Sequence, residues 1–206
     1  MILEACVETY DEARLAQERG ADQVELCADL DQDGLTPGRE LITRVATSLN
    51  IPVKVMVRPR AGDFHYDLRE LESMIATIAF CKKASVKGVV FGILKQNNEL
   101  DIKAIRELAN FASPLEVTIH KAIDLTPDPL QSLNKLLESV SIFSVLTSGG
   151  RDTAAEGSAV IRKMIDRSAG KIQVIAAGKI TNENLEEIHR IIGGTAYHGR
   201  RIVGTL

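Results

Sequence analysis

Residues 3–27, LEACVETYDEARLAQERGADQVELC, indicate how the whole chain folds. Leu3–Cys6 predicts a short strand, Thr9–Arg19 a helix, and Val24–Cys27 a second strand with the same order of residue types: apolar, Glu, apolar, Cys. Residues two apart on a strand face the same side, so each Glu shares a face with the Cys that follows it. If the two strands are parallel neighbours in a closed barrel, both Glu-x-Cys pairs point into its interior and end at its mouth.

The alternation of strand and helix continues along the rest of the chain. Seven segments of helical character separate eight of strand character, at about 2–6, 23–27, 53–57, 88–91, 115–119, 142–146, 172–176 and 195–198. Thr36 is predicted to cap a helix that begins at Pro37. Strict alternation implies a parallel sheet, and eight units predict a (β/α)8 TIM-type barrel that lacks its last helix. The alternative, an open doubly wound sheet, favours a G-x-G-x-x-G turn after the first strand, but Cys6–Thr9 contains no glycine.

Composition narrows the class of protein. The chain of 206 residues is 45% hydrophobic and 26% charged, and without a linker or low-complexity segment residues 1–206 predict one domain. A net charge of -3 and the absence of Trp argue against a nucleic-acid partner. No apolar run reaches the ~20 residues that span a bilayer, and no signal peptide is recognisable. We therefore expect a cytoplasmic protein, with no membrane partner, whose three cysteines are free thiols.

Cys6 and Cys27 are the candidates for a metal site. Soft thiolates favour Cu(I), and Met56, in the third predicted strand, could add a thioether. The alternative is that both cysteines are small buried hydrophobic residues. Inward residues of one barrel layer come from alternate strands, so adjacent strands can hold the two sulfurs in different layers. A separation beyond roughly 5 Å would exclude a shared ion, because metal–sulfur bonds are about 2.3 Å long.

Charged residues in the strands indicate either a buried ion-pair network or an acid–base site. Glu4, Glu25 and Lys54 lie in the middle of the first three predicted strands. If these side chains point inward, an unpaired charge is costly. Histidine and carboxylate groups at the carboxyl ends of strands suit proton transfer, because barrel active sites lie at these ends. The predicted catalytic residues are Glu4, Glu25, His120 and Asp124.

A further set of residues is typical of anion binding. Arg58 and Arg60 follow the third strand, and guanidinium groups suit carboxylate or phosphate ligands. The loop around Gly178 leads to a predicted helix capped by Thr181, and barrel phosphate sites commonly use the loops after strands 7 and 8. The predicted ligand-binding residues are Arg58, Arg60, Ser148, Gly149, Gly178 and His198. They favour an alternative function, a TIM-barrel enzyme that acts on a small anionic metabolite by acid–base catalysis.

Several of these motifs together resemble the CutC family of copper-homeostasis proteins. The resemblance covers nearly the whole chain, and its most specific string is RPRAGDF, residues 58–64. The other strings are LEACV (3–7), GADQVELCA (20–28), GLTP (34–37), VMV (55–57), VTIHKAID (117–124), VLTSG (145–149) and AAG (176–178).

The resemblance implies a (β/α)8-type barrel, a cytoplasmic location and a role in copper handling or tolerance. It also implies that Cys6 and Cys27 are the natural candidates to bind copper as Cu(I). A small anionic ligand, indicated by the arginines and the glycine-containing loops, is the alternative partner. Chains of the family usually continue past the eighth strand, whereas this sequence stops at Leu206. We therefore expect the closing region either to be truncated or to be completed by another subunit, which would make the protein a homo-oligomer.

Overall fold

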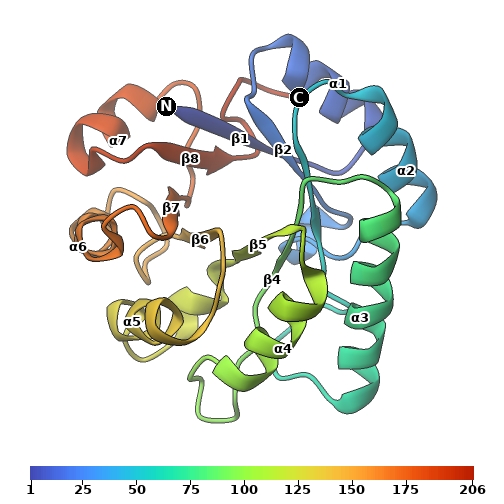
Figure 1. Ribbon diagram of the computed structural model, residues 1–206. Helices are drawn as coiled ribbons and strands as arrows, with labels where there is room; N and C mark the ends of the chain where they lie inside the picture. The colour runs from blue at the N-terminus through green and yellow to red at the C-terminus, as the bar shows by residue number, and fades with distance from the viewer.

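The eight strands form one closed parallel barrel in the order β1 to β8, which confirms the predicted TIM-type fold and excludes the open sheet (Figure 1). The computed structural model describes residues 1–206. The barrel closes through parallel pairing of β1 with β8, in which Ile2 lies opposite Ala196. The strands are β1 (Ile2–Val7), β2 (Gln23–Leu26), β3 (Val53–Met56), β4 (Gly88–Phe91), β5 (Glu116–Ile119), β6 (Ser144–Thr147), β7 (Gln173–Ala176) and β8 (Ala196–Gly199).

Seven α-helices cover the outside of the barrel, one after each of the first seven strands (Figure 1). The first begins at a capping box, in which Thr9 and Glu12 each bind the other's main-chain N–H. Short 3-10 helices follow β2 (Leu30–Gln32) and β5 (Lys121–Leu125). The α-helices are α1 (Tyr10–Glu18), α2 (Arg39–Ser48), α3 (Leu68–Lys83), α4 (Ile102–Ala112), α5 (Pro129–Ser139), α6 (Ser158–Ser168) and α7 (Leu185–Ile192).

Side chains alternate across the barrel wall with the period of two that a strand imposes. On β1, Ala5 and Val7 belong to the main hydrophobic core between strands and helices. Cys6 instead packs inside the barrel in a small cluster with Cys27 and Met56. The polar interior residues are nearly inaccessible to solvent, as predicted for Glu4, Glu25 and Lys54. The interior thus combines an ionic layer with a sulfur-rich one.

Two helices begin later than the sequence predicts. The N-cap of α2 is Gly38, and Thr36 is used elsewhere: its hydroxyl accepts from Arg58 N (2.8 Å) and donates to Arg58 O (3.0 Å). Helix α7 begins at Leu185, after an N-cap at Asn184, so Thr181 does not cap it. The loop around Gly178 therefore does not lead directly into a helix N-terminus.

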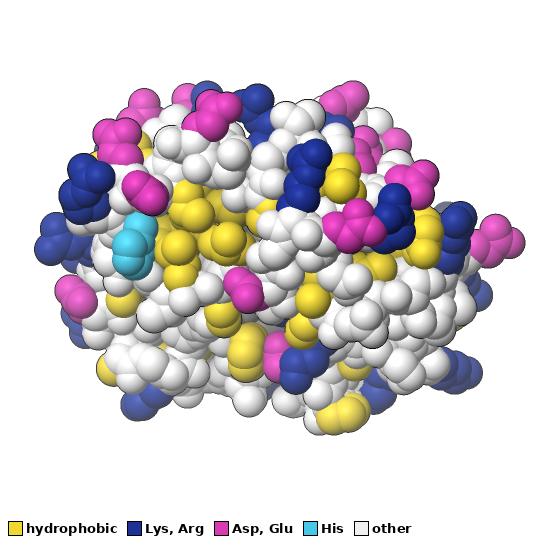
Figure 2. Space-filling model, turned by 90° about the horizontal axis from the view of Figure 1, so that it is seen from above, with side chains coloured by type: hydrophobic (Ala, Val, Ile, Leu, Met, Phe, Trp, Pro, Cys, Tyr) yellow, Lys and Arg dark blue, Asp and Glu magenta, His cyan; other side chains and the backbone are white.

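The segment after β8 takes the place of an eighth helix. It runs from the barrel to α1, where Arg19 donates a hydrogen bond to Thr205 O, and it buries Ile202 against the main core. Figure 2 views the molecule from the side of the chain termini and shows hydrophobic side chains gathered near the middle of this face, among charged groups of both signs. None of the helices combines the length and apolar character that crossing a bilayer requires.

Candidate functional site

A cavity of about 810 Å³ opens at the carboxyl ends of the strands, where barrel proteins place their active sites. Most of the residues selected from the sequence line it: Cys6, Glu25, Cys27, Arg58, His120, Asp124, Ser148, Gly178 and His198. Glu4, Arg60 and Gly149 are not among its lining residues. The cavity therefore joins the predicted metal site and most of the predicted anion site in one space.

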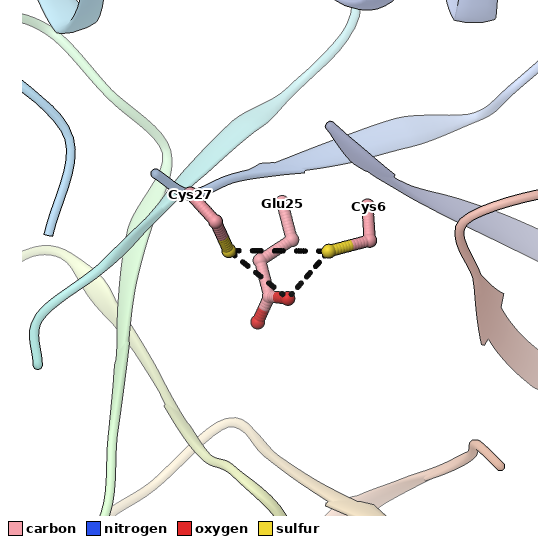
Figure 3. A group of neighbouring side chains, drawn as sticks. All are labelled: Cys6, Glu25 and Cys27. Atoms are coloured by element: carbon pink, nitrogen blue, oxygen red, sulfur yellow. Dashed lines mark hydrogen bonds between the residues drawn. The ribbon is translucent and has the colours of Figure 1, made fainter. Parts of the chain in front are cut away.

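Cys6, Glu25 and Cys27 form a compact triangle at one side of this cavity (Figure 3). The two sulfurs are 3.9 Å apart, and Glu25 Oε2 lies 3.6 Å from Cys6 Sγ and 3.7 Å from Cys27 Sγ. In the β1–β2 register Cys6 lies opposite Glu25 rather than opposite Cys27. The cysteines therefore occupy successive levels, but their side chains converge within the distance that permits a shared ion.

Glu4 lies deeper in the barrel, at the centre of a buried polar network. Its carboxylate accepts from Gln23 Nε2 (2.6 Å), lies 2.9 Å from His198 Nδ1 and forms an ion pair with Lys54 Nζ (3.3 Å). Burial alone would raise the pKa of Glu4, but the His198 hydrogen bond and the Lys54 charge outweigh it and lower the pKa to about 2. Glu4 therefore belongs to a buried ion-pair network, as predicted, and its carboxylate stays ionised inside the barrel.

The triangle divides its charges unevenly. The hydrogen bond with Cys27 and the proximity of His198 lower the pKa of Cys6 to about 5, against the effect of burial. The same sulfur–sulfur contact and burial raise the pKa of Cys27 well above its usual value. Burial raises the pKa of Glu25 to about 8. At neutral pH the triangle therefore holds one thiolate, one thiol and a carboxyl group that is largely protonated.

His198 connects the triangle to the deeper network. Its Nδ1 contacts Glu4 and its Nε2 lies 3.7 Å from Glu25 Oε2. Burial would lower the pKa of His198, but Glu25, Cys6 and Glu4 surround the ring and raise the pKa well above its usual value. An imidazolium therefore lies next to the thiolate of Cys6.

Arg58 has most of its donors already engaged. Nη1 donates to the carbonyls of Gln32 (2.7 Å) and Gly34 (3.0 Å), and Nη2 donates to that of Gly62 (2.9 Å). The Nε–H of this buried guanidinium has no partner. Arg58 thus anchors two loops of the barrel mouth and retains one free donor.

His120 is buried in the cavity wall and held by contacts of its ring. Its Nδ1 accepts from Ala122 N at 3.1 Å, and its ring centroid lies 4.6 Å from that of Phe64. Burial and the Arg58 charge lower the pKa of His120 to about 3, so the ring is neutral. A Cβ on Gly92 would lie 2.6 Å from the ring, so only glycine leaves room for it there.

Asp124 organises the loop that follows β6. Its carboxylate accepts from Ser148 N (2.8 Å), Ser148 Oγ (3.0 Å) and Gly150 N (2.9 Å), and also from the hydroxyl of Thr147. Gly149 N donates to Thr147 Oγ1 at 2.9 Å. These contacts use up the main-chain donors that a phosphate would need, and they give Asp124 a positioning role.

The structure separates the two arginines of the RPR string. Arg60 forms ion pairs with Asp63 and Glu70 at the start of α3, away from the cavity. Sequence reasoning did not select Gln23 or Phe64 for the site. Gln23 stands two residues before Glu25, so the period of two could have identified it as a third inward side chain of β2.

Comparisons with known proteins agree with the resemblance noted from the sequence. Residues 1–203 match the family model described as the CutC family. Copper homeostasis protein cutC homolog from Homo sapiens is 39% identical over 197 residues, covering 96% of this chain and 72% of the human protein. A CutC family protein from Mesorhizobium japonicum is also 39% identical, covering 96% and 76% of the two chains. The crystal structure of a CutC protein from Streptococcus agalactiae, 29% identical, superposes with a TM-score of 0.92 and covers 98% of this chain and 99% of that one. The chain therefore belongs to the CutC family.

Proposed function

We propose that this protein binds one Cu(I) ion between Cys6 and Cys27 in the cytoplasm, as its part in copper homeostasis. The triangle of Cys6, Glu25 and Cys27 carries the proposal. Its sides measure 3.9, 3.6 and 3.7 Å. A point equidistant from the three atoms therefore lies about 2.2 Å from each, within the range of metal–ligand bonds in proteins.

The donor chemistry also fits Cu(I). Two sulfur ligands are the donors that this ion prefers, and the thioether-bearing Met56 belongs to the same small buried cluster as the two cysteines. Glu25 Oε1 is buried without a hydrogen-bond partner, so the carboxyl group is free to turn toward an ion. Two thiolates and Cu(I) together carry one negative charge, which the imidazolium of His198 beside the triangle offsets.

The experiment is a titration of reduced, metal-free protein with Cu(I) against a chromophoric Cu(I) chelator. The parent protein should withdraw one equivalent, and the double variant Cys6→Ser/Cys27→Ser should bind at least about 100-fold more weakly. Cys81→Ser is the matched control, because Cys81 is a buried free thiol in α3 outside the cavity lining. Equal affinity of the parent and the double variant would contradict the proposal.

The cavity supports a second proposal, an enzyme that acts on a small anionic metabolite. Glu25 and His198 lie 3.7 Å apart and have strongly displaced pKa values, which is typical of acid–base sites. Glu25, protonated at neutral pH, would be the proton donor. Turnover of a small anionic metabolite that persists in Cys27→Ser and disappears in Glu25→Gln would support this activity. Turnover of the metabolite that Glu25→Gln leaves unaffected would contradict it.

A further inference from the structure

Two buried N–H groups in the cavity wall have no hydrogen-bond partner. They are Arg58 Nε–H and His120 Nε2–H, on side chains that are 3% and 4% exposed. Buried donors are rarely left without an acceptor, because each such group costs the free energy of its lost hydration. Both residues line the cavity, so an acceptor that enters it can reach this part of the wall.

The neutral ring of His120 presents a hydrogen-bond donor, and not a base, to the cavity. Nδ1 accepts the main-chain N–H of Ala122, so the single proton of the neutral ring is on Nε2. The ring and the Arg58 guanidinium both lie against Phe64: the ring centroids are 4.6 Å apart, and Arg58 Cζ lies 4.9 Å from the Phe64 centroid. One aromatic side chain thus brings the two free donors into the same region.

The surrounding charge favours an anion. Six lining residues are Lys or Arg and four are Asp or Glu. Of the basic residues, Lys121, Arg151, Lys179 and Arg201 form no ion pair within 4.0 Å. The acid count also overstates the negative charge, because Glu25 is largely protonated at neutral pH. An incoming anion therefore meets a net positive cavity.

We propose that Arg58 Nε–H and His120 Nε2–H bind a carboxylate group of a small organic acid inside the barrel cavity. A carboxylate offers two oxygens to two N–H donors on planar groups. A phosphate is the less suitable ligand, because the main-chain donors of the loop after β6 are already bound by Asp124 and Thr147. The inference does not depend on copper binding or on any catalytic step.

Two variants of His120 separate its two nitrogens. In His120→Asn the amide oxygen can still accept from Ala122 N, but the donor at the Nε2 position is lost. In His120→Gln the longer amide keeps a donor near the Nε2 position and loses the contact with Ala122. The pair therefore distinguishes ligand binding from support of the loop, and thermal unfolding checks that both variants fold.

The probes are succinate and inorganic phosphate, each titrated calorimetrically into reduced, metal-free protein at pH 7. Succinate should bind the parent, bind His120→Asn at least about tenfold more weakly, and bind His120→Gln within about threefold of the parent. Cys81→Ser, outside the cavity lining, should bind succinate like the parent. Because the titration contains no copper, a failed copper site and a failed carboxylate site are distinguishable. Absence of succinate binding, equal binding by His120→Asn and the parent, or tighter binding of phosphate than of succinate would each overturn the proposal.

A direct readout covers the case in which the variants do not fold. In parent protein labelled with ¹⁵N at histidine, succinate should shift the His120 Nε2 resonance and leave His120 Nδ1, which is bound to Ala122, nearly unchanged. A titration that moves neither nitrogen would overturn the assignment of His120 to the ligand.

Discussion

Glu4-Ala5-Cys6 on β1 and Glu25-Leu26-Cys27 on β2 are the same motif on neighbouring strands, yet the two copies differ in charge. Both glutamates are at least 98% buried. The pKa of Glu4 is lowered to about 2, whereas that of Glu25 is raised to about 8. Glu4 has Lys54, His198 and Gln23 around it, and Glu25 faces two sulfurs. Because both glutamates belong to the same motif and are about equally buried, their neighbouring groups account for the difference in charge.

The pairing register of the two strands produces this difference. Glu4 lies opposite Gln23 and Cys6 lies opposite Glu25, so the second motif is displaced toward the mouth by one inward step. This displacement puts Glu25 between the two cysteines and leaves Glu4 to the deeper ionic layer. If Glu4 lay opposite Glu25 in the register, the two carboxylates would be side by side and would repel each other.

The strongest test of the ionic layer is Lys54→Met, which leaves Glu4 without one of the two cations that contact it. We expect the free energy of unfolding at pH 7 to fall by about 3–5 kcal/mol, because a buried carboxylate loses one of its two cationic partners. Urea denaturation measures it. The double variant Glu4→Gln/Lys54→Met should recover at least half of the loss. Lys87→Met is the control: it removes the exposed pair with Glu116 and should cost less than about 1 kcal/mol. If Lys54→Met lowered the free energy of unfolding by less than about 1 kcal/mol, Lys54 would not be the stabilising partner of Glu4.

The acid limb of the stability curve tests Glu4. Its folded pKa of about 2 lies below the ordinary value of 4.5, so its carboxylate stabilises the fold above pH 4.5, and this contribution disappears as the pH falls to 2. The difference in unfolding free energy between the parent and Glu4→Gln should shrink by about 3 kcal/mol over this interval. Chemical denaturation at a series of pH values measures it, and a difference independent of pH would contradict the lowered pKa.

Glu25 should give the opposite slope in the metal-free protein. Its folded pKa of about 8 lies above the ordinary value of 4.5. The contribution of protonated Glu25 to the free energy of unfolding is therefore fully present below pH 4.5 and is lost as the pH rises through 8. Glu25→Gln keeps a neutral side chain and removes this loss. Between pH 6 and pH 8 the parent should lose about 2 kcal/mol relative to the variant, measured by the same denaturation series. Parallel curves would show that Glu25 is ionised in the folded protein.

The fold was predictable because each β/α unit carries its own local pattern. The helix predicted over Thr9–Arg19 agrees with α1, which begins at the capping box of Thr9 and Glu12, and the absence of glycine after β1 was enough to favour a closed barrel. The predicted caps at Thr36 and Thr181 were wrong, because a hydroxyl suited to a helix cap also suits other hydrogen bonds. Thr36 binds the main chain of Arg58, a contact between segments 22 residues apart.

The site was predictable in its residue types and not in its geometry. The period of two identified the inward side chains, but the 3.9 Å sulfur separation depends on the strand register, which a single sequence does not reveal. The loop after β3 shows the same limit. Arg58 and Arg60 are two residues apart in one string, yet Arg58 lines the cavity and Arg60 binds Glu70 of α3. The tertiary contacts of this loop determine which arginine side chain points into the cavity and which points toward α3.

The smallest expected effect compares the two sulfurs themselves. At pH 7 Cys6 should be mostly thiolate, because its pKa is lowered to about 5, whereas Cys27 keeps its proton. Thiolates are the reactive species, although a low pKa also reduces nucleophilicity. We expect iodoacetamide to modify Cys6 at least about tenfold faster than Cys27 in metal-free protein, measured by mass spectrometry of the peptides.

Cys81 provides the control for accessibility in this experiment. It is a buried thiol whose pKa is raised to about 12 by burial, so it should react as slowly as Cys27. Glu4→Gln is the informative variant, because it withdraws the hydrogen-bonded carboxylate from His198 and weakens the cation beside Cys6. The advantage of Cys6 should decrease in that variant. Equal rates for Cys6 and Cys27 in the parent would show that the two motifs share one thiolate evenly, and the contrast between the strands would then be confined to their glutamates.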